Sequence, residues 1–142
     1  MAELPQEEQP VVLVVEDNQV NRMVARQMLK RGGIVAEEAD GGRRSLEQLR
    51  ERRFDLVLMD VQMPGMDGLE TTRAIRNGEA GAENRDVPIV AITAYASSDD
   101  EQACYAAGMN AYLSKPLNMQ KFLDTVREMI RIGRKSPQGP DA

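Results

Sequence analysis

Histidine and tryptophan are absent from this 142-residue chain, and only one cysteine, Cys104, is present. Without histidine, imidazole-based acid–base chemistry is excluded, and a single cysteine leaves no plausible zinc site. A lone cysteine cannot form an internal disulfide, which suits a reducing compartment, and we expect Cys104 to be a small buried helix residue. Chemistry in this chain must therefore use carboxylates, hydroxyls, lysine or a cation bound by oxygen ligands.

A net positive charge is also lacking, because 23 acidic residues outnumber 18 lysines and arginines for a net charge of −5, and no stripe is rich in lysine and arginine. This balance argues against nucleic acid or an anionic membrane surface as a partner. No apolar run approaches the ~18 residues of a membrane-spanning helix, and the acidic start "MAELPQEEQP" lacks the pattern of a signal peptide. We therefore expect a cytoplasmic protein with one domain, built on a 42% hydrophobic composition.

Five short apolar runs are typical of β-strands. The first, third and fourth are continuously apolar rather than alternating, as expected of parallel strands that are buried on both faces. The runs are "VVLVV" (11–15), "IVAEE" (34–38), "DLVLM" (55–59), "IVAIT" (89–93) and "NAYLS" (110–114).

The segments between these runs show helical periodicity. In the first, apolar residues recur at helical spacing from Val20 to Met28 before Gly32-Gly33 ends the helix. Asp67, a residue of "SSDDE" (97–101) and Asn118 can serve as N-caps of later helices. The apolar residues of the last helix fall on one face: Phe122, Val126, Met129 and Ile130.

Strictly alternating strands and helices predict an α/β fold of the (βα)5 type, with helices on both faces of a parallel five-stranded sheet. We expect the domain to span residues 10–132, with flexible tails at 1–9 and 133–142. Residues 77–86 are expected to form a polar surface loop.

Polar residues follow four of the five expected strands. Glu16 and Asp17 follow the first, Asp60 the third, Thr93 ends the fourth, and Lys115 follows the last. Each has an ordinary explanation alone, such as a solvated turn, a good strand former or a surface lysine. Because ligands bind at the carboxyl ends of the strands in open parallel sheets, their joint placement instead predicts one site.

Three carboxylates gathered at one edge repel one another, so they either retain protons or bind a cation. With oxygen ligands alone, Mg²⁺ is the natural candidate. A carboxylate in such a site can attack phosphorus and form an aspartyl phosphate. Asp60 is then the candidate acceptor, and Lys115, Thr93 and the metal ion would neutralise and position the phosphoryl group.

These residues lie in motifs that resemble the receiver domains of two-component response regulators. The motifs, in order, are "VVEDN" (14–18), "LMDVQMPGMDG" (58–68), "IVAITA" (89–94) and "AGMNAYLSKP" (107–116). "VEDNQVNR" and "DVQMPGMDG" look most like receivers of hybrid sensor histidine kinases. The resemblance implies a flavodoxin-like three-layer sandwich with strand order 2-1-3-4-5.

The resemblance also assigns roles to individual residues. It implies phosphorylation of Asp60, Mg²⁺ bound by Asp17, Asp60 and the backbone carbonyl of Gln62, and Glu16 reaching the ion through water. Thr93 and Lys115 would contact the phosphate.

Three further features follow from the same resemblance. A cis peptide is expected at Lys115-Pro116, and Gln62 and Tyr95 should tune the lifetime of the phosphoryl group. Tyr112 would change position on activation, together with Thr93, and so alter the surface made by helix 4, strand 5 and helix 5.

The implied function is a phosphoryl-accepting switch rather than an enzyme. The chain has no histidine and no Walker-type glycine loop, so we expect no labelling from ATP. The donor would be a histidine kinase or a histidine phosphotransfer protein, and a downstream protein target would read the switch.

Three other classes of protein fit these residues less well. A hydrolase of the haloacid-dehalogenase type needs a second aspartate where Gln62 stands. A flavodoxin-like electron carrier needs a hydroxyl-rich phosphate loop where "EDNQVNR" is acidic. A pseudo-receiver would lack the acceptor or the lysine, and this chain has both Asp60 and Lys115.

Overall fold

In the computed structural model, which describes residues 9–94 and 97–135, five parallel strands form one sheet in the order β2-β1-β3-β4-β5. This order and the alternation with helices confirm the predicted fold. The strands are β1 (Val11–Val15), β2 (Val35–Ala39), β3 (Leu56–Asp60), β4 (Ile89–Thr93) and β5 (Ala111–Ser114).

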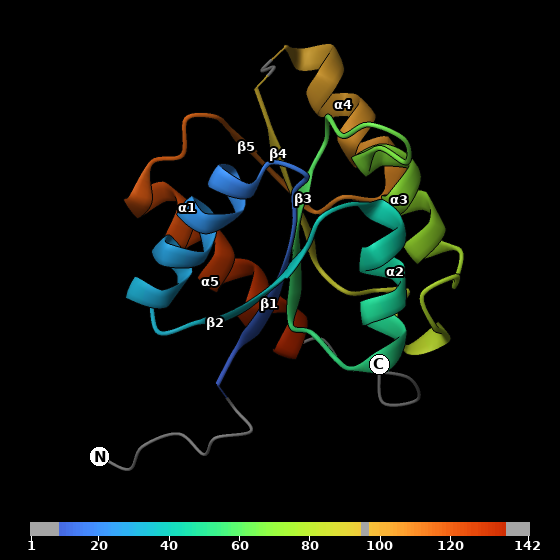
Figure 1. The fold of residues 1–142 in the computed structure, drawn as a ribbon, viewed down its shortest axis with the longest axis horizontal. Helices are drawn as coiled ribbons and strands as arrows, with labels where there is room; N and C mark the ends of the chain where they lie inside the picture. The colour runs from blue at the N-terminus through green and yellow to red at the C-terminus, as the bar shows by residue number, and fades with distance from the viewer. Residues whose placement is uncertain (1–8, 95–96, 136–142) are drawn as a thin grey trace.

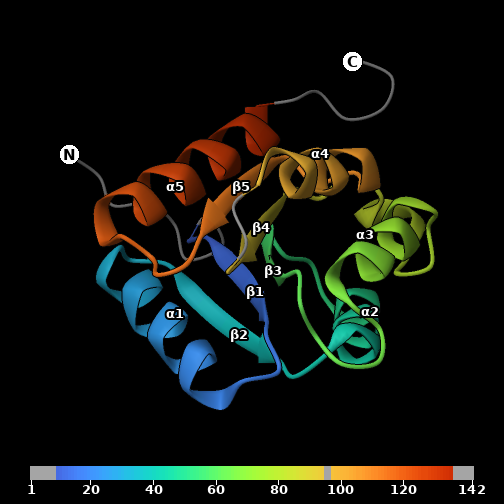
Figure 2. The same ribbon diagram turned by 90° about the horizontal axis from the view of Figure 1, so that it is seen from above.

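In the described part of the chain, five α-helices cover the two faces of the sheet, as Figure 1 illustrates. Figure 2 shows two of them, α1 and α5, on one face and the other three on the opposite face. Among the described residues, no helix is long and apolar enough to cross a membrane. The helices are α1 (Gln19–Arg31), α2 (Gly42–Glu51), α3 (Gly68–Arg76), α4 (Ser98–Ala107) and α5 (Met119–Lys135).

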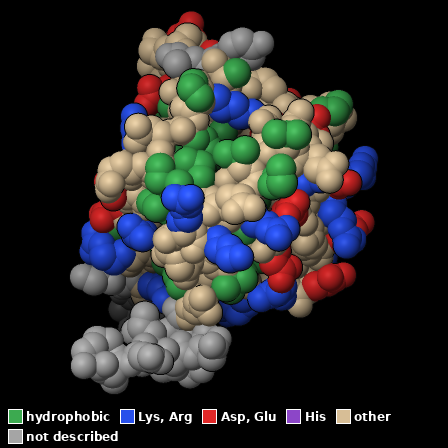
Figure 3. All heavy atoms as spheres, turned by 60° about the vertical axis from the view of Figure 1, so that its left-hand side comes forward, with side chains coloured by type: hydrophobic (Ala, Val, Ile, Leu, Met, Phe, Trp, Pro, Cys, Tyr) green, Lys and Arg blue, Asp and Glu red, His purple; other side chains and the backbone are tan. Residues whose placement is uncertain are grey.

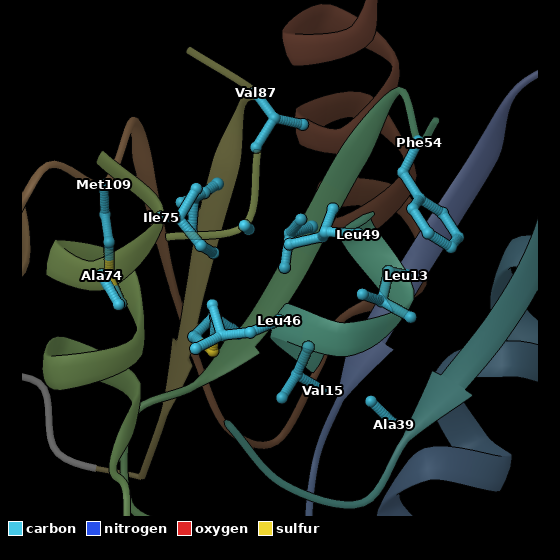
Figure 4. Close-up of a cluster of buried hydrophobic side chains, with 14 of the residues drawn as sticks. Leu13, Val15, Ala39, Leu46, Leu49, Phe54, Ala74, Ile75, Val87 and Met109 are labelled. Atoms are coloured by element: carbon cyan, nitrogen blue, oxygen red, sulfur yellow. The ribbon is translucent and has the colours of Figure 1, made fainter. Parts of the chain in front are cut away.

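Each face of the sheet has its own apolar core. On the face of α2, α3 and α4, Leu46 and Leu49 of α2 pack in one cluster with Leu13 and Val15 of β1 (Figure 4). On the face of α1 and α5, Phe122 packs with Leu29 and with the other set of strand side chains. Because alternate side chains of a strand point to opposite faces, continuously apolar strands fill both cores.

The predicted caps are present. Asp67 accepts a hydrogen bond from the backbone N–H of Glu70 at 2.8 Å, and Ser97 and Asn118 accept from residues three positions later at 3.0 Å each. Gly108 ends α4 with a φ of +112°, a conformation that favours glycine. Local chemistry therefore fixes where these helices begin or end.

Three strands differ from the predicted bounds. The expected runs 34–38, 55–59 and 110–114 each start one residue too early. For the first, the reason is that the N–H of Ile34 donates to the carbonyl of Leu29 at 3.0 Å and so still belongs to the end of α1.

Helix α5 continues to Lys135, past residue 132, and the predicted boundaries of the domain and its tails stay predictions. Arg134 of the last turn donates to Asp55 at 3.0 Å, and this contact holds the end of the helix against a distant segment. The predicted tails otherwise lie outside the described residues, apart from Gln9.

The expected polar loop 77–86 contains the short 3₁₀ helix Ala82–Asn84 and is not wholly exposed. Asn84 is buried, and its amide donates to the carbonyls of Leu49 and Ala80 at 2.8 and 2.7 Å. A polar side chain can be buried there because the backbone supplies its hydrogen-bond partners.

Candidate functional site

The carboxyl ends of four strands meet at one edge of the sheet. Glu16 directly follows β1, Asp60 is the last residue of β3, Thr93 is the last of β4, and Lys115 directly follows β5. The N–H of Lys115 donates to the carbonyl of Thr93 at 2.8 Å, which aligns the ends of β4 and β5. All four residues predicted from separate motifs therefore lie at the same edge.

Glu16, Asp17 and Asp60 form an acidic cluster. One carboxylate oxygen from each lies within 4.8 Å of the others. Glu16 and Asp60 are buried, whereas Asp17 is exposed. Two buried carboxylates so close together are costly unless positive charge or protons compensate them.

Lys115 supplies part of that compensation. Its ammonium nitrogen lies 3.5 Å from Oδ1 of Asp60 and 3.4 Å from Oε1 of Glu16. Burial and then the neighbouring Glu16 carboxylate nevertheless raise the pKa of Asp60 to about 7, against the opposing effects of Lys115 and of the Gln62 N–H. The cluster thus carries more negative charge than one lysine balances.

This donor set fits a hard divalent cation. Three carboxylates can each offer an oxygen, and a cation among them would relieve the repulsion that raises the pKa of Asp60. Gln62 lies beside the cluster, and its N–H donates to Oδ1 of Asp60 at 3.3 Å. The predicted use of its backbone carbonyl as a ligand stays a prediction.

A close approach of backbones shapes the site behind Asp60. The N–H of Gly68, the first residue of α3, donates to the carbonyl of Val61 at 3.1 Å. A methyl group on Gly68 would collide with the carbonyl oxygen of Asp60 and with Val61. Glycine is therefore required at the first residue of α3, because the backbone there lies directly against the end of β3 at Asp60 and Val61.

Thr93 is buried, and its hydroxyl donates to the side-chain oxygen of Gln62 at 3.0 Å. The sequence alone does not predict this contact. Gln62 and Thr93 belong to separate motifs, and only the pairing of β3 with β4 places residue 62 beside residue 93.

Tyr112 of β5 is partly buried and packs against the cluster that contains Cys104. Burial first, and then the nearby groups Cys104, Asp100 and Glu101 of α4, raise the pKa of the Tyr112 hydroxyl. The Tyr112 side chain therefore packs on the face of the sheet that α4 covers. Tyr95, the other position expected to tune the site, lies outside the described residues, whereas the Lys115-Pro116 peptide is cis as predicted.

An apolar pocket adjoins the acidic cluster. It has a volume of about 630 Å³, and its lining includes Asp60, Val24 and Met28 of α1, and Pro116 and Leu117 after β5. Figure 3 shows hydrophobic side chains gathered on this side of the molecule, bordered by lysine and arginine. Val20, Met23 and Val24 are exposed, although their spacing is typical of a buried helix face.

The family of response regulator receiver domains matches residues 12–127. Among curated relatives, the sensor protein GacS of Pseudomonas syringae pv. syringae is 37% identical over 128 residues, which cover 90% of this chain and 14% of GacS. The polar-differentiation response regulator DivK of Brucella anthropi is 34% identical over 119 residues, which cover 84% of this chain and 94% of DivK. The chain thus spans a small part of one relative and most of the other.

Two solved structures show the same fold. The receiver domain of a sensor histidine kinase from Pseudomonas aeruginosa PAO1, with a magnesium ion coordinated in its active-site cleft, has a TM-score of 0.78 and 36% identity, and the match covers 87% of this chain and 98% of that one. The chemotaxis protein CheY4 of Vibrio cholerae has a TM-score of 0.78 and 30% identity, and the match covers 85% of this chain and 98% of CheY4. The sequence motifs, the strand order and these matches agree, and the chain belongs to the response regulator receiver domain family, the phosphoryl-accepting signalling domains of two-component phosphorelays.

Proposed function

We propose that Asp60 is the phosphoryl acceptor of this receiver domain. The observation that carries the proposal is the acidic cluster itself, in which Asp60 lies within 4.8 Å of two further carboxylates and 3.5 Å from the Lys115 ammonium. A carboxylate at the end of a rigid buried strand is held in position for attack on phosphorus.

In the proposed step, one oxygen of Asp60 attacks the phosphorus of a phosphohistidine. A P–O bond forms, the P–N bond breaks, and the electron pair returns to the donor's imidazole. Lys115 favours the ionised, nucleophilic form of Asp60 and can contact a phosphoryl oxygen, and the Thr93 hydroxyl can donate to another.

Mg²⁺ is the cofactor in this proposal. The residues that would hold it are Asp17, Asp60 and the carbonyl of Gln62, and Glu16 would reach the ion through water. When bound, the ion supplies positive charge for the phosphoryl oxygens and for the acidic cluster.

The donor is a histidine kinase or a histidine phosphotransfer protein, and we place its docking site on α1. The exposed Val20, Met23 and Val24 lie in the first half of the helix, which starts just after the acidic cluster. The adjacent pocket extends from Val24 to Asp60, so a protein seated on this apolar surface could present a histidine to the acceptor.

The single cysteine suits a reducing compartment, and the proposed location is the cytoplasm.

Phosphorylation would act as a switch through Thr93. The phosphoryl group adds negative charge and acceptor oxygens that compete with Gln62 for the Thr93 hydroxyl. Movement of Thr93 would change the space open to Tyr112 and hence the surface of α4, β5 and α5, which a downstream protein reads. We expect Thr93→Ala to be phosphorylated but to lose the NMR shift of Tyr112 on addition of beryllofluoride and Mg²⁺. An unchanged Tyr112 shift would exclude Thr93 as the link.

The acceptor can be tested with acetyl phosphate and intact-mass measurement. The unmutated protein should gain one phosphoryl group only when Mg²⁺ is present, and Asp60→Asn should gain none. Asp67→Asn is the matched control, since it removes a nearby carboxylate but keeps a residue that can cap α3. Undiminished labelling of Asp60→Asn would place the acceptor elsewhere.

A further inference from the structure

Arg22 of α1 joins the loop of the acidic cluster to the neighbouring strand β2. Its terminal nitrogen donates to the backbone carbonyl of Glu16 at 2.7 Å, and its Nε donates to the carboxylate of Glu38 at 2.9 Å. Only 15% of the Arg22 side chain and 28% of the Glu38 side chain are exposed, so both hydrogen bonds are partly shielded from water. Charge-assisted hydrogen bonds of this kind are stronger than those between neutral groups.

The Arg22 contact completes the fixation of the Glu16 backbone. The N–H of Glu16 donates to the carbonyl of Ala39 at 3.0 Å, and its carbonyl accepts from Arg22. That carbonyl belongs to the planar peptide that joins Glu16 to Asp17. Fixing the plane of this peptide therefore fixes the positions from which both carboxylates reach toward Asp60.

We propose that Arg22 is a positioning residue for the metal site, holding the Glu16–Asp17 peptide so that both carboxylates face Asp60 before a cation binds. The inference rests on the proposed Mg²⁺ site. The three carboxylates repel one another, and Asp17 is exposed, so a loop without this anchor can relax outward. Mg²⁺ requires near-ideal octahedral geometry, which makes its affinity sensitive to such a displacement.

The chemistry of Arg22 suits two partners at once. A guanidinium carries several donors in one rigid plane, whereas a lysine ammonium is a compact charge on a flexible stem. Glu38 holds the guanidinium in place, and its second carboxylate oxygen accepts from Arg26 at 2.8 Å. Arg22 and Arg26 thus share Glu38, but of the two only Arg22 is hydrogen-bonded to the Glu16 carbonyl.

This shared partner provides a matched control. Arg22→Met and Arg26→Met each remove one hydrogen-bonded ion pair with Glu38, and methionine keeps an unbranched stem and good helix propensity. The dissociation constant for Mg²⁺ would be measured by titration followed through backbone amide NMR shifts. The melting temperature of each protein would be measured in Mg²⁺-free buffer. We expect Arg22→Met to bind Mg²⁺ roughly tenfold to a hundredfold more weakly and Arg26→Met to stay within about twofold of the unmutated protein.

Arg22→Lys is the second variant, and we expect intermediate Mg²⁺ affinity because one ammonium cannot reproduce both contacts. Equal Mg²⁺ affinity of folded Arg22→Met and Arg26→Met would overturn the positioning role. If Arg22→Met does not fold, Arg22→Lys becomes the test of the positioning role. An unchanged Mg²⁺ affinity of Arg22→Lys would then reject that role. Failure of the unmutated protein to bind Mg²⁺ would instead reject the proposed metal site, and the positioning role with it.

Discussion

Helices α1 and α5 cover the same face of the sheet, yet they use their apolar residues differently (Figure 2). In α5, the residues that predicted the helix are turned inward, and Phe122 and Val126 are each 0% exposed. In α1, Val20 is 60% exposed and Met23 53%, although their spacing also predicted a helix. The buried residues of α1 are Ala25, Met28 and Leu29, so of the periodic residues from Val20 to Met28 the core takes up only the later ones.

Both helices begin at the edge that carries the acidic cluster, because α1 follows Asp17 and α5 follows Lys115 in the chain. The difference lies in the first half of α1, where Val20, Met23 and Val24 are exposed. Its apolar residues occupy a wider arc than packing against the sheet requires, and the excess faces solvent beside the pocket. An apolar surface that does not stabilise the fold is available to a partner.

The largest effect is expected in the buried helix. Phe122→Ala should lower the free energy of unfolding by about 3–5 kcal/mol, because it removes a large side chain from the core between α5 and the sheet. Chemical denaturation followed by circular dichroism measures this loss. If Phe122→Ala lowers the free energy of unfolding by less than ~1 kcal/mol, the buried face of α5 does not stabilise the fold more than the exposed residues of α1 do. The contrast between the two helices would then be wrong.

The exposed residues of α1 should affect phosphotransfer from the donor rather than the stability of the fold. The double variant Val20→Thr, Met23→Gln should keep its free energy of unfolding within about 0.5 kcal/mol, because both side chains are exposed. Its rate of phosphotransfer from a histidine-phosphorylated donor should fall roughly tenfold, since apolar contacts dominate docking energies.

Labelling by acetyl phosphate, which needs no docking surface, provides the internal reference for this variant. The matched control is Ile132→Gln, which changes an exposed apolar residue at the far end of α5 and should leave transfer unchanged. Equal losses in transfer for the two proteins would show that no particular apolar surface guides the donor.

The acidic edge beside α1 should lower stability when no metal is present. The folded pKa of Asp60 is about 7, above its usual 3.8, so the folded state binds more protons between these values. The contribution of Asp60 to the free energy of unfolding is therefore fully present below about pH 4 and is lost as the pH rises from about 4 to about 7.

Asp60→Asn should remove that loss. We expect it to raise the free energy of unfolding by about 1 kcal/mol at about pH 8 in Mg²⁺-free buffer, a value well below the full shift because solvent screens charges at the rim of the site. The gain should disappear near pH 4. Thermal unfolding across this pH range tests the expectation, and a variant less stable than the unmutated protein at high pH would contradict it.

The smallest effect is expected at the end of α5. Arg134→Gln removes the ion pair with Asp55, and because both side chains are partly exposed the loss should be about 0.5 kcal/mol. Amide hydrogen exchange should nevertheless rise in the last turn of α5, which that contact anchors. Arg131→Gln, which removes a local pair with Glu128, serves as the control. Identical exchange in the two variants would show that Asp55 does not anchor the helix end.

Much of this protein was determined by local sequence. Continuously apolar strands, caps such as Asp67 and Asn118, and polar residues at four strand ends predicted the fold and brought Glu16, Asp17, Asp60 and Lys115 to one edge. These predictions succeeded because strand periodicity, capping and the geometry of a parallel sheet act over a few residues or follow from topology alone.

Only the tertiary structure decided which apolar residues of α1 are exposed, that Gln62 accepts from Thr93, and that Arg22 holds the carbonyl of Glu16 against β2. It also extended α5 through the contact between Arg134 and Asp55, which are 79 positions apart. The physical reason is shared: each of these features depends on packing between separate elements, and local periodicity carries no information on which neighbour a side chain will meet.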